Sequence, residues 1–406
     1  EPVTRPQTDG FVGEDGYEAQ ARLAAYASLT KRAEALGATL PTDRQAAYFE
    51  LVLYPLRSAG NLNKRILSFD LAALYARDGR AGANSYVSDA QVAQAGIDTD
   101  TAAYNALENG KWQHMMDARP RDLPVFTPPV WPQYSASDRT GCDLAFSGGR
   151  VINAHDFPRL TFVRGVPGDQ VIEVYSREAR DVPVTLTPIA GLSIDATHLT
   201  LDEASRWQSR LHFHWNGLGQ SGQMAITCGA QTFSVPVDVV DGPSVPVDAV
   251  EVERRVTIPA AAAASSDWEA ISELGSQGRV LRSRLDLPGH RQPQDAKTLS
   301  YKVFTTSAGE ADLTVIALPT HPLSPETGLK VGVQVDDGPI QTIDFKTVGR
   351  SDTWKRNVLS NTALGEAGKA ALSRGNHVVK IYALDPGVVL DRIELTFAGA
   401  PQRYAP

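Results

Sequence analysis

Residues 329–345 read LKVGVQVDDGPIQTIDF, and their alternation of apolar and polar side chains predicts a β-hairpin. Val331, Val333 and Val335 recur with a period of two, which places them on one face of a strand. The run DDGP that follows is typical of a turn, and Pro339 within it favours a connection longer than two residues. The C-terminal half of the chain is therefore expected to consist of strands.

Further alternating runs lie on both sides of this hairpin. They cover residues 299–305, 311–318, 377–384 and 392–397. Together with the hairpin they predict a jelly-roll β-sandwich over residues 242–406.

Residues 142–241 also alternate with a period of two, in short runs separated by Gly and Pro turns. About seven strands within about 100 residues is typical of an immunoglobulin-like β-sandwich, and we expect that fold here. Cys142 and Cys228, the only two cysteines of the chain, both belong to this segment. A disulfide between them and a pair of free or buried thiols are both compatible with the sequence.

The N-terminal segment, residues 1–118, has the periodicity of helices. Five helices are expected, with Pro55 kinking or ending the second, the fourth over about residues 85–95 and the fifth from about residue 100. Five prolines interrupt residues 119–141 without a period, which predicts an extended connector. The predicted fold class is thus multidomain α + β: a helical bundle, then the immunoglobulin-like sandwich, then the jelly roll.

Composition and missing motifs exclude several classes of function. The 406 residues carry 39 Lys and Arg against 47 Asp and Glu, a net charge of −8, with no basic run, so nucleic acid is not an expected partner. No segment has the ~20 uninterrupted apolar residues of a membrane span. The chain has no P-loop, no strand–GxGxxG–helix unit and no G-x-S-x-G elbow, and we expect neither a cofactor nor a serine nucleophile.

Two patterns of ionisable residues were weighed as chemical sites. His212 and His214 are expected on the same face of a strand, but a third metal ligand is not evident, and we predict no metal site. The acidic pair Asp336/Asp337 lies in a turn-like segment, and its expected role is structural. The sequence therefore selects no catalytic pair of carboxylates for glycoside hydrolysis.

Tryptophan side chains are candidates for binding sugars, because the apolar face of a pyranose stacks on an indole ring. Trp112, Trp131, Trp268 and Trp354 are the candidates, each weighed against ordinary core packing.

Three stretches in chain order carry a family resemblance. The first is YFELVLYPL at 48–56 with AGNLNK at 59–64, and the second is GKWQHMMD at 110–117. The third combines WKRNV at 354–358 and Asn361 with GNH at 375–377 and DPGVVLDRI at 385–393. In this order they resemble the C-terminal half of the glycoside hydrolase family 115 α-glucuronidases, which remove glucuronic acid or its 4-O-methyl ether from xylan side chains.

The resemblance implies that the catalytic part of such an enzyme, a TIM-like barrel preceded by a small domain, lies upstream of this chain. It therefore implies no catalytic residue here. Asn61, Lys64, Trp112 and His114 are the expected residues of a barrel interface or of the fringe of the substrate, and Trp268, Trp354 and His377 those of a carbohydrate site.

Our first hypothesis is the barrel-supporting, C-terminal portion of a secreted or periplasmic xylan α-glucuronidase. Its expected partners are the missing catalytic part, xylan and a second copy in a homodimer. Because the chain begins at Glu1 rather than Met, we expect that a signal peptide or a larger piece was removed. The alternatives are a stand-alone, non-catalytic carbohydrate-binding protein and a self-sufficient enzyme with its site between the β domains.

Overall fold

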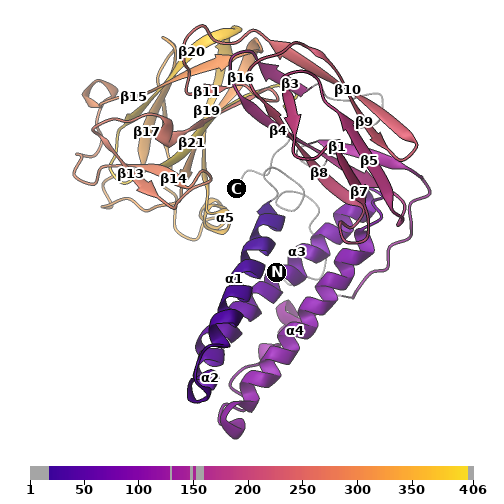
Figure 1. Ribbon diagram of the computed structural model, residues 1–406. Helices are drawn as coiled ribbons and strands as arrows, with labels where there is room; N and C mark the ends of the chain where they lie inside the picture. The colour runs from indigo at the N-terminus through magenta and orange to yellow at the C-terminus, as the bar shows by residue number, and fades with distance from the viewer. Residues whose placement is uncertain (1–17, 129, 147–149, 152–159, 401–406) are drawn as a thin grey trace.

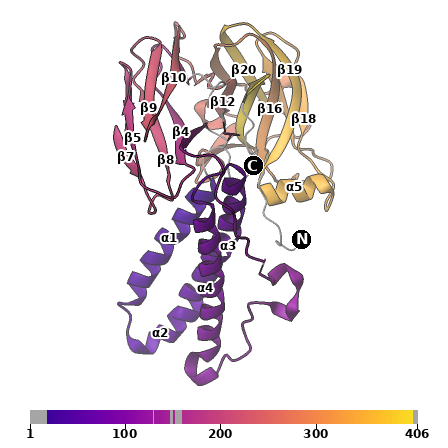
Figure 2. The ribbon, with the colours of Figure 1, turned by 90° about the vertical axis from the view of Figure 1, so that its right-hand side faces the viewer.

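The computed structural model describes residues 18–128, 130–146, 150–151 and 160–400. A helical part comes first and a β-rich part with four sheets follows, which confirms the order of predicted secondary structure. Figure 1 shows the helices projecting as a long, narrow arm from the β-rich part. Figure 2, turned by 90°, shows the two halves of the β-rich part side by side above this arm.

The arm is built from four α-helices and one π-helical segment. They are α1 (Glu18–Gly37), α2 (Thr42–Tyr48), the π-helix η2 (Phe49–Leu53), α3 (Tyr54–Arg77) and α4 (Ala83–Gly110). Pro55 lies in the first turn of α3, directly after η2, and Tyr48, Leu53 and Tyr54 all keep right-handed helical backbone angles, so Pro55 does not end the helix. The π-helical turn that precedes it is a local irregularity of the kind expected beside a proline, which lacks the N–H of a regular turn.

The prediction of separate helices near residues 85–95 and beyond residue 100 is wrong, because α4 runs through both. Gly96 lies at the expected break, and an added Cβ there would come within 2.7 Å of the Asn61 amide of α3. The glycine therefore allows α3 and α4 to approach closely and does not interrupt the helix.

The apolar core of the arm is concentrated near the β-rich part. Leu67, Leu71, Leu74 and Tyr75 of α3 pack there against neighbours from α4. At the other end, neither α2 nor η2 contains a buried residue. Leu51 of η2 is 72% exposed, so this end of the arm does not bury its own apolar side chains.

The middle part, from residue 142 to residue 240, has two sheets that enclose one core. One has the order β2-β1-β4-β8-β6 and the other the order β3-β10-β9-β5-β7. Cys142 of β1 and Cys228 of β9 form a disulfide that joins the two sheets, which decides between the two states of these thiols. The strands are β1 (Cys142–Phe146), β2 (Arg150–Val151), β3 (Leu160–Val163), β4 (Gly168–Ser176), β5 (Val182–Thr187), β6 (Leu192–Ile194), β7 (His198–Leu201), β8 (Gln208–Trp215), β9 (Gly222–Cys228) and β10 (Gln231–Val240).

The C-terminal part again has two sheets around one core, and one helix, α5 (Asp352–Ser360). One sheet has the order β11-β15-β20-β17-β18, and the other the order β13-β14-β21-β16-β19 with β12 also paired to β21. The strands are β11 (Ala249–Val250), β12 (Arg255–Pro259), β13 (Trp268–Ser272), β14 (Arg279–Ser283), β15 (Leu299–Thr305), β16 (Gly309–Leu318), β17 (Lys330–Val335), β18 (Gln341–Asp344), β19 (Ala363–Leu372), β20 (Gly375–Ala383) and β21 (Val389–Phe397). The predicted hairpin is confirmed as β17–β18, and its connection is longer than two residues, as Pro339 requires.

The arm is joined to the middle part by buried polar contacts as well as by the chain itself. Arg80, in the turn between α3 and α4, donates from Nη1 to Oε2 of Glu173 on β4 at 2.9 Å. Arg177 donates to the carbonyl of Asp78 at 2.9 Å, and the backbone N–H of Ala81 donates to that of Ser176 at 3.0 Å. These contacts fix the direction in which the arm leaves the β-rich part.

Candidate functional site

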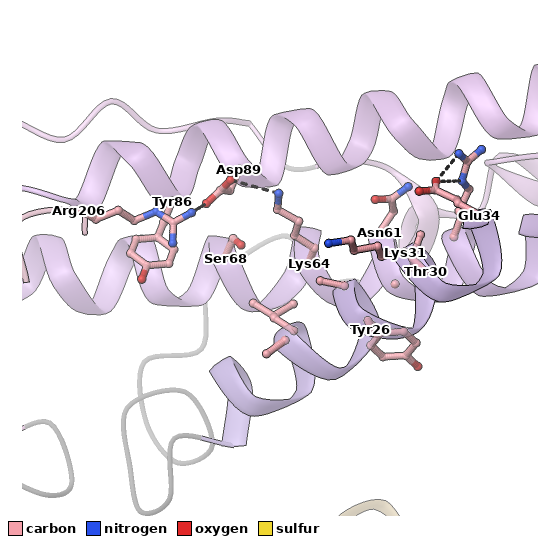
Figure 3. A pocket seen from close by; sticks show the side chains of 15 residues that line it. Tyr26, Thr30, Lys31, Glu34, Asn61, Lys64, Ser68, Tyr86, Asp89 and Arg206 are labelled. Atoms are coloured by element: carbon pink, nitrogen blue, oxygen red, sulfur yellow. Dashed lines mark hydrogen bonds and ion pairs between the residues drawn. The ribbon is translucent and has the colours of Figure 1, made fainter. Parts of the chain in front are cut away.

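A groove of about 460 Å³ runs along the arm between α1, α3 and the start of α4. Its volume is within the range of pockets that hold small molecules, about 300–1,000 Å³. Arg206, from the turn between β7 and β8, closes one end, so the β-rich part also contributes to the groove. Figure 3 shows these elements and the side chains that line the groove.

The polar wall of the groove is a stripe on α3. Arg57, Asn61, Lys64 and Ser68 follow one another at spacings of four, three and four residues, which is the repeat of one helix face. These four side chains therefore line the groove together. The spacing also explains why the predicted residues Asn61 and Lys64 lie side by side.

The facing wall comes from α1 and is partly apolar. Leu23, Tyr26 and Ala27 contribute carbon surface, and Thr30 and Lys31 contribute polar atoms. The ring of Tyr26 lies over Gly60 of α3, where an added Cβ would be 3.5 Å from the ring. Tyr26 therefore packs directly on the backbone of α3 at the groove.

Two carboxylates of the groove are held by cationic side chains. Asp89 of α4 pairs with Lys64, at 3.2 Å between Nζ and Oδ1, and also accepts from Arg206. Glu34 accepts from Nε of Arg57 at 3.1 Å, and this bond is the main reason that the pKa of Arg57 is raised. Arg57 also reaches Asp100 at 3.3 Å, where burial raises the pKa of the carboxyl.

Two polar groups of the groove are left without such partners. Lys31 has no ion pair, and Asn61 has no side-chain hydrogen bond, within the described part of the chain. In Figure 3 the ammonium group of Lys31 extends from α1 toward Lys64, with Asn61 beside it. The groove therefore combines available hydrogen-bond donors with positive charge, and this arrangement suits an anion.

This geometry does not resemble that of a glycoside-hydrolysing site. Such a site needs two carboxylates on opposite sides of a glycosidic bond. In the groove, Glu34 and Asp89 are instead engaged by cations on the surrounding helices. The groove is accordingly a candidate binding site.

Trp112 and His114 lie elsewhere on the arm. Both follow α4, whose regular helix breaks at Leu107–Asn109, roughly 25 Å along the helix from Asp89 at a rise of 1.5 Å per residue. Trp112 is half-buried with Nζ of Lys111 at 4.7 Å from its ring centre, and His114 is exposed. The structure therefore does not bring these two residues together with Asn61 and Lys64.

The tryptophans of the C-terminal part differ in accessibility. Trp268 is only 6% exposed and belongs to the core between the two sheets, which favours the alternative of core packing over an exposed sugar platform. Trp354 is half-buried on α5 and remains accessible. Trp131 packs edge-on against Phe69, with 5.9 Å between the ring centres.

His377 is a structural residue in this fold. Its Nδ1 lies 2.7 Å from Oδ2 of Asp336, and its Nε2 lies 2.8 Å from the carbonyl oxygen of Ser373. Both ring nitrogens are therefore engaged, and the histidine ties the start of β20 to the β17–β18 turn. It has no free nitrogen for a carbohydrate ligand.

The histidine pair of β8 does not form a metal site. Within the residues described, no group of three or more His, Cys, Asp or Glu side chains is arranged to hold a metal ion. His214 lies between two aspartates instead, with Nδ1 2.7 Å from Asp169 and Nε2 2.9 Å from Asp195. His212 is exposed on the same strand.

Besides Lys64, the charged side chains of the groove were not predicted from the sequence; they are Lys31, Glu34, Arg57, Asp89 and Arg206. Arg57 could have been predicted, because its spacing places it on the same helix face as Asn61 and Lys64. A stripe of polar side chains on a helix face that is expected to be packed indicates a polar surface there. Asp89 and Arg206 come from distant parts of the chain, and no local pattern links them to α3.

Comparison with known proteins identifies a family domain in the C-terminal part of the chain and a similar fold for the whole. Residues 249–405 match the model of the glycosyl hydrolase family 115 C-terminal domain. The fold of the chain is similar to that of BtGH115A, a family 115 4-O-methyl-α-glucuronidase described as having specificity for decorated arabinogalactans, with a TM-score of 0.52 and 20% identity. The match covers 96% of this chain and 34% of that protein, so the chain spans about a third of its length. These findings confirm the resemblance to the C-terminal half of the family that the sequence motifs predicted.

Two further solved structures match with lower TM-scores. The GH26-CBM35 β-(1,4)-mannanase of Podospora anserina has a TM-score of 0.26 and 13% identity over 38% of this chain and 29% of its own. The C-terminal CBM6 of LamC from Zobellia galactanivorans has a TM-score of 0.24 and 14% identity over 35% of this chain and 99% of its own. A search of curated proteins finds no match. None of the helices in the described part of the chain combines the length and apolarity that a bilayer crossing demands.

Proposed function

We propose that this chain is the non-catalytic, C-terminal portion of a family 115 xylan α-glucuronidase, and that it supports a catalytic part preceding it in the same polypeptide. The observation that carries this proposal is the fold match, which covers nearly all of this chain but only 34% of a family 115 4-O-methyl-α-glucuronidase. The family match over residues 249–405 supports the same assignment. The reaction is the release of glucuronic acid or its 4-O-methyl ether from xylan side chains.

The far end of the arm is the surface that we assign to the catalytic part. Short helices are marginally stable in water on their own, and in proteins most of their stability comes from the packing of an apolar face against neighbours. Here Leu36, Leu51 and Leu62 are exposed, and α2 and η2 bury none of their residues. A neighbouring domain that covers these side chains would supply the missing packing.

For the β-rich part we propose an immunoglobulin-like sandwich from β1 to β10 and a jelly roll from β11 to β21. Each consists of two sheets around a single apolar core, as either fold requires. The Cys142–Cys228 disulfide supports a secreted or periplasmic location, because structural disulfides persist in oxidising compartments. Xylan and a second copy of the chain are the other proposed partners.

The proposal is tested by comparing the 406-residue chain with a longer polypeptide that includes the upstream coding sequence. Both are incubated with glucuronoxylan and with glucuronic acid-decorated arabinogalactan, and released uronic acid is measured. We expect release only by the longer polypeptide. Release by the 406-residue chain alone would show that it is a self-sufficient enzyme, and no release by either would remove the assignment to an α-glucuronidase.

A matched pair of substitutions tests the assigned surface. Leu51→Asp on the arm and Leu218→Asp in the middle part replace side chains that are 72% and 70% exposed. In the 406-residue chain both should leave the melting temperature unchanged, because neither leucine is packed. In the longer polypeptide only Leu51→Asp should lower it, and equal effects of the two substitutions would argue against the arm as the docking surface.

A further inference from the structure

We propose that the groove between α1 and α3 is a binding site for a hexuronic acid, with Lys31, Asn61 and Lys64 holding the carboxylate. The inference rests on the proposed function, which brings this chain into contact with polysaccharides that carry glucuronate. It assigns a uronate-binding site to the arm.

The charge of the groove favours an anion. At one end of the groove Asp89 pairs with Lys64 and Arg206, and Lys31 of the facing helix adds a third cation that has no ion pair within the described residues. At the opposite end of the groove, Arg57 lies between two carboxylates, Glu34 and Asp100. That end of the groove therefore carries an excess of one negative charge. The positive excess is therefore local, and it is centred where Lys31 extends toward Lys64 in Figure 3.

The donors of the groove suit a carboxylate better than a phosphate. Phosphate sites commonly use free backbone N–H groups at a helix N-terminus or in a glycine-rich loop. Here Lys31, Asn61 and Lys64 lie well inside α1 and α3, where backbone N–H groups are engaged in the helices. Two ammonium groups and one side-chain amide remain as donors, which is enough for the two oxygens of a carboxylate.

The remainder of the groove suits a sugar ring. Leu23, Tyr26 and Ala27 offer apolar surface for the C–H groups of a pyranose. The hydroxyl of Thr30, which is half-buried, has no side-chain hydrogen bond within the described residues and is available to a sugar hydroxyl. A groove of about 460 Å³ accommodates one or two such rings.

The test is isothermal titration of the 406-residue chain with methyl α-D-glucuronoside, and with methyl α-D-glucopyranoside, which has the same ring without the carboxylate. We expect heat of binding only with the glucuronoside, and an affinity that falls with added salt because the cations are partly exposed. Lys31→Gln and Asn61→Ala should each weaken binding about tenfold, since each removes a hydrogen bond to a charged group. Lys302→Gln, a substitution of an exposed lysine on β15, should have no effect.

Three outcomes would overturn the inference. Inorganic phosphate that binds as tightly as the glucuronoside would indicate an unselective anion site. Unchanged affinity of Lys31→Gln and Asn61→Ala would place any binding elsewhere. Binding by this chain that is lost in the longer polypeptide would show that the groove receives a carboxylate of the protein itself. The titration measures binding and not hydrolysis. A failure of the binding proposal is therefore distinguishable from a failure of the proposed function, which is tested by the release of uronic acid from the polysaccharide.

Discussion

Arg80 and Glu173 form an ion pair across the junction between the helical arm and the middle β part, with 2.9 Å between Nη1 and Oε2. Their side chains are only 1% and 6% exposed. The guanidinium group also lies over the rings of Tyr75 on the arm and Tyr175 on β4, at 4.3 and 4.4 Å from their centres. The pair therefore joins two parts of the chain that are almost 100 residues apart at this contact.

Removal of one charge of this pair should destabilise the protein strongly. Glu173→Gln leaves the Arg80 guanidinium buried without its main carboxylate, and breaking a buried ion pair costs about 3 kcal/mol or more. We expect the midpoint of unfolding in urea, followed by tryptophan fluorescence, to shift to a lower urea concentration. Glu269→Gln, which breaks the exposed pair with Arg282, should cost less than about 1 kcal/mol and serves as the control.

Removal of both charges should cost less than removal of one. Arg80→Met combined with Glu173→Leu leaves neither charge of this pair buried, and buried pairs replaced by apolar residues are often close to neutral. We expect the double variant to be more stable than Glu173→Gln. Equal loss of stability in both would mean that the contacts of Arg80 with Tyr75 and Tyr175 matter more than its ion pair.

The fold was predicted from the sequence wherever a local pattern decides it. The period-two alternation of residues 329–345 predicted β17 and β18, because side chains alternate along any strand with one buried face. The break expected near Gly96 was wrong because packing between α3 and α4 determines that position, and local propensity does not include such packing. The pairing of Cys142 with Cys228 likewise depends on two sheets that only the folded chain brings together.

The groove was predictable only in part for the same reason. Asn61 and Lys64 belong to one motif on one helix and were identified as candidates. Asp89 and Arg206 complete the site from α4 and from the turn before β8, more than 100 residues apart. For Trp268 the sequence left a sugar platform and core packing as alternatives, and only the folded chain shows that the ring lies in the core.

Reduction of the disulfide should destabilise the middle part. Cys142 and Cys228 are both buried and join the two sheets across 86 residues of sequence, and a loop of this size is worth about 4 kcal/mol in the chain-entropy model. We expect the melting temperature, measured by calorimetry, to fall in the presence of a reductant. Because these are the only cysteines, the Cys142→Ala/Cys228→Ala variant should be insensitive to the reductant, and a continued response would contradict this account.

His214 should titrate above the ordinary range of a histidine. Hydrogen bonds that the protonated ring donates to Asp169 and then to Asp195 raise the pKa of His214, so the protonated form is favoured in the folded protein. The contribution of protonated His214 to the stability of the folded protein is therefore fully present below the unfolded-state pKa of about 6.5. This contribution is lost as the pH rises through the raised pKa of the folded state. NMR titration of the imidazole should show a lower pKa in Asp169→Asn, whereas Asp352→Asn on the distant helix α5 should leave it unchanged.

Trp268 and Trp354 should respond in opposite ways to truncation. Trp268→Ala empties a buried site between the two C-terminal sheets and should cost about 3–5 kcal/mol of stability, as other buried tryptophans do. Trp354→Ala removes a half-buried ring from the surface helix α5 and should cost about 1 kcal/mol or less.

Electrophoresis in gels containing glucuronoxylan separates these structural effects from binding. If Trp354 contacts the polysaccharide, its alanine variant migrates faster than the unsubstituted chain while keeping its melting temperature, because the lost ring contributes to binding and not to the core. Phe126→Ala, which truncates an exposed aromatic side chain of the connector, is the matched control and should not change the mobility. Unretarded migration of the unsubstituted chain itself would remove Trp354 as a carbohydrate contact, and binding would then have to be sought in the groove of the arm.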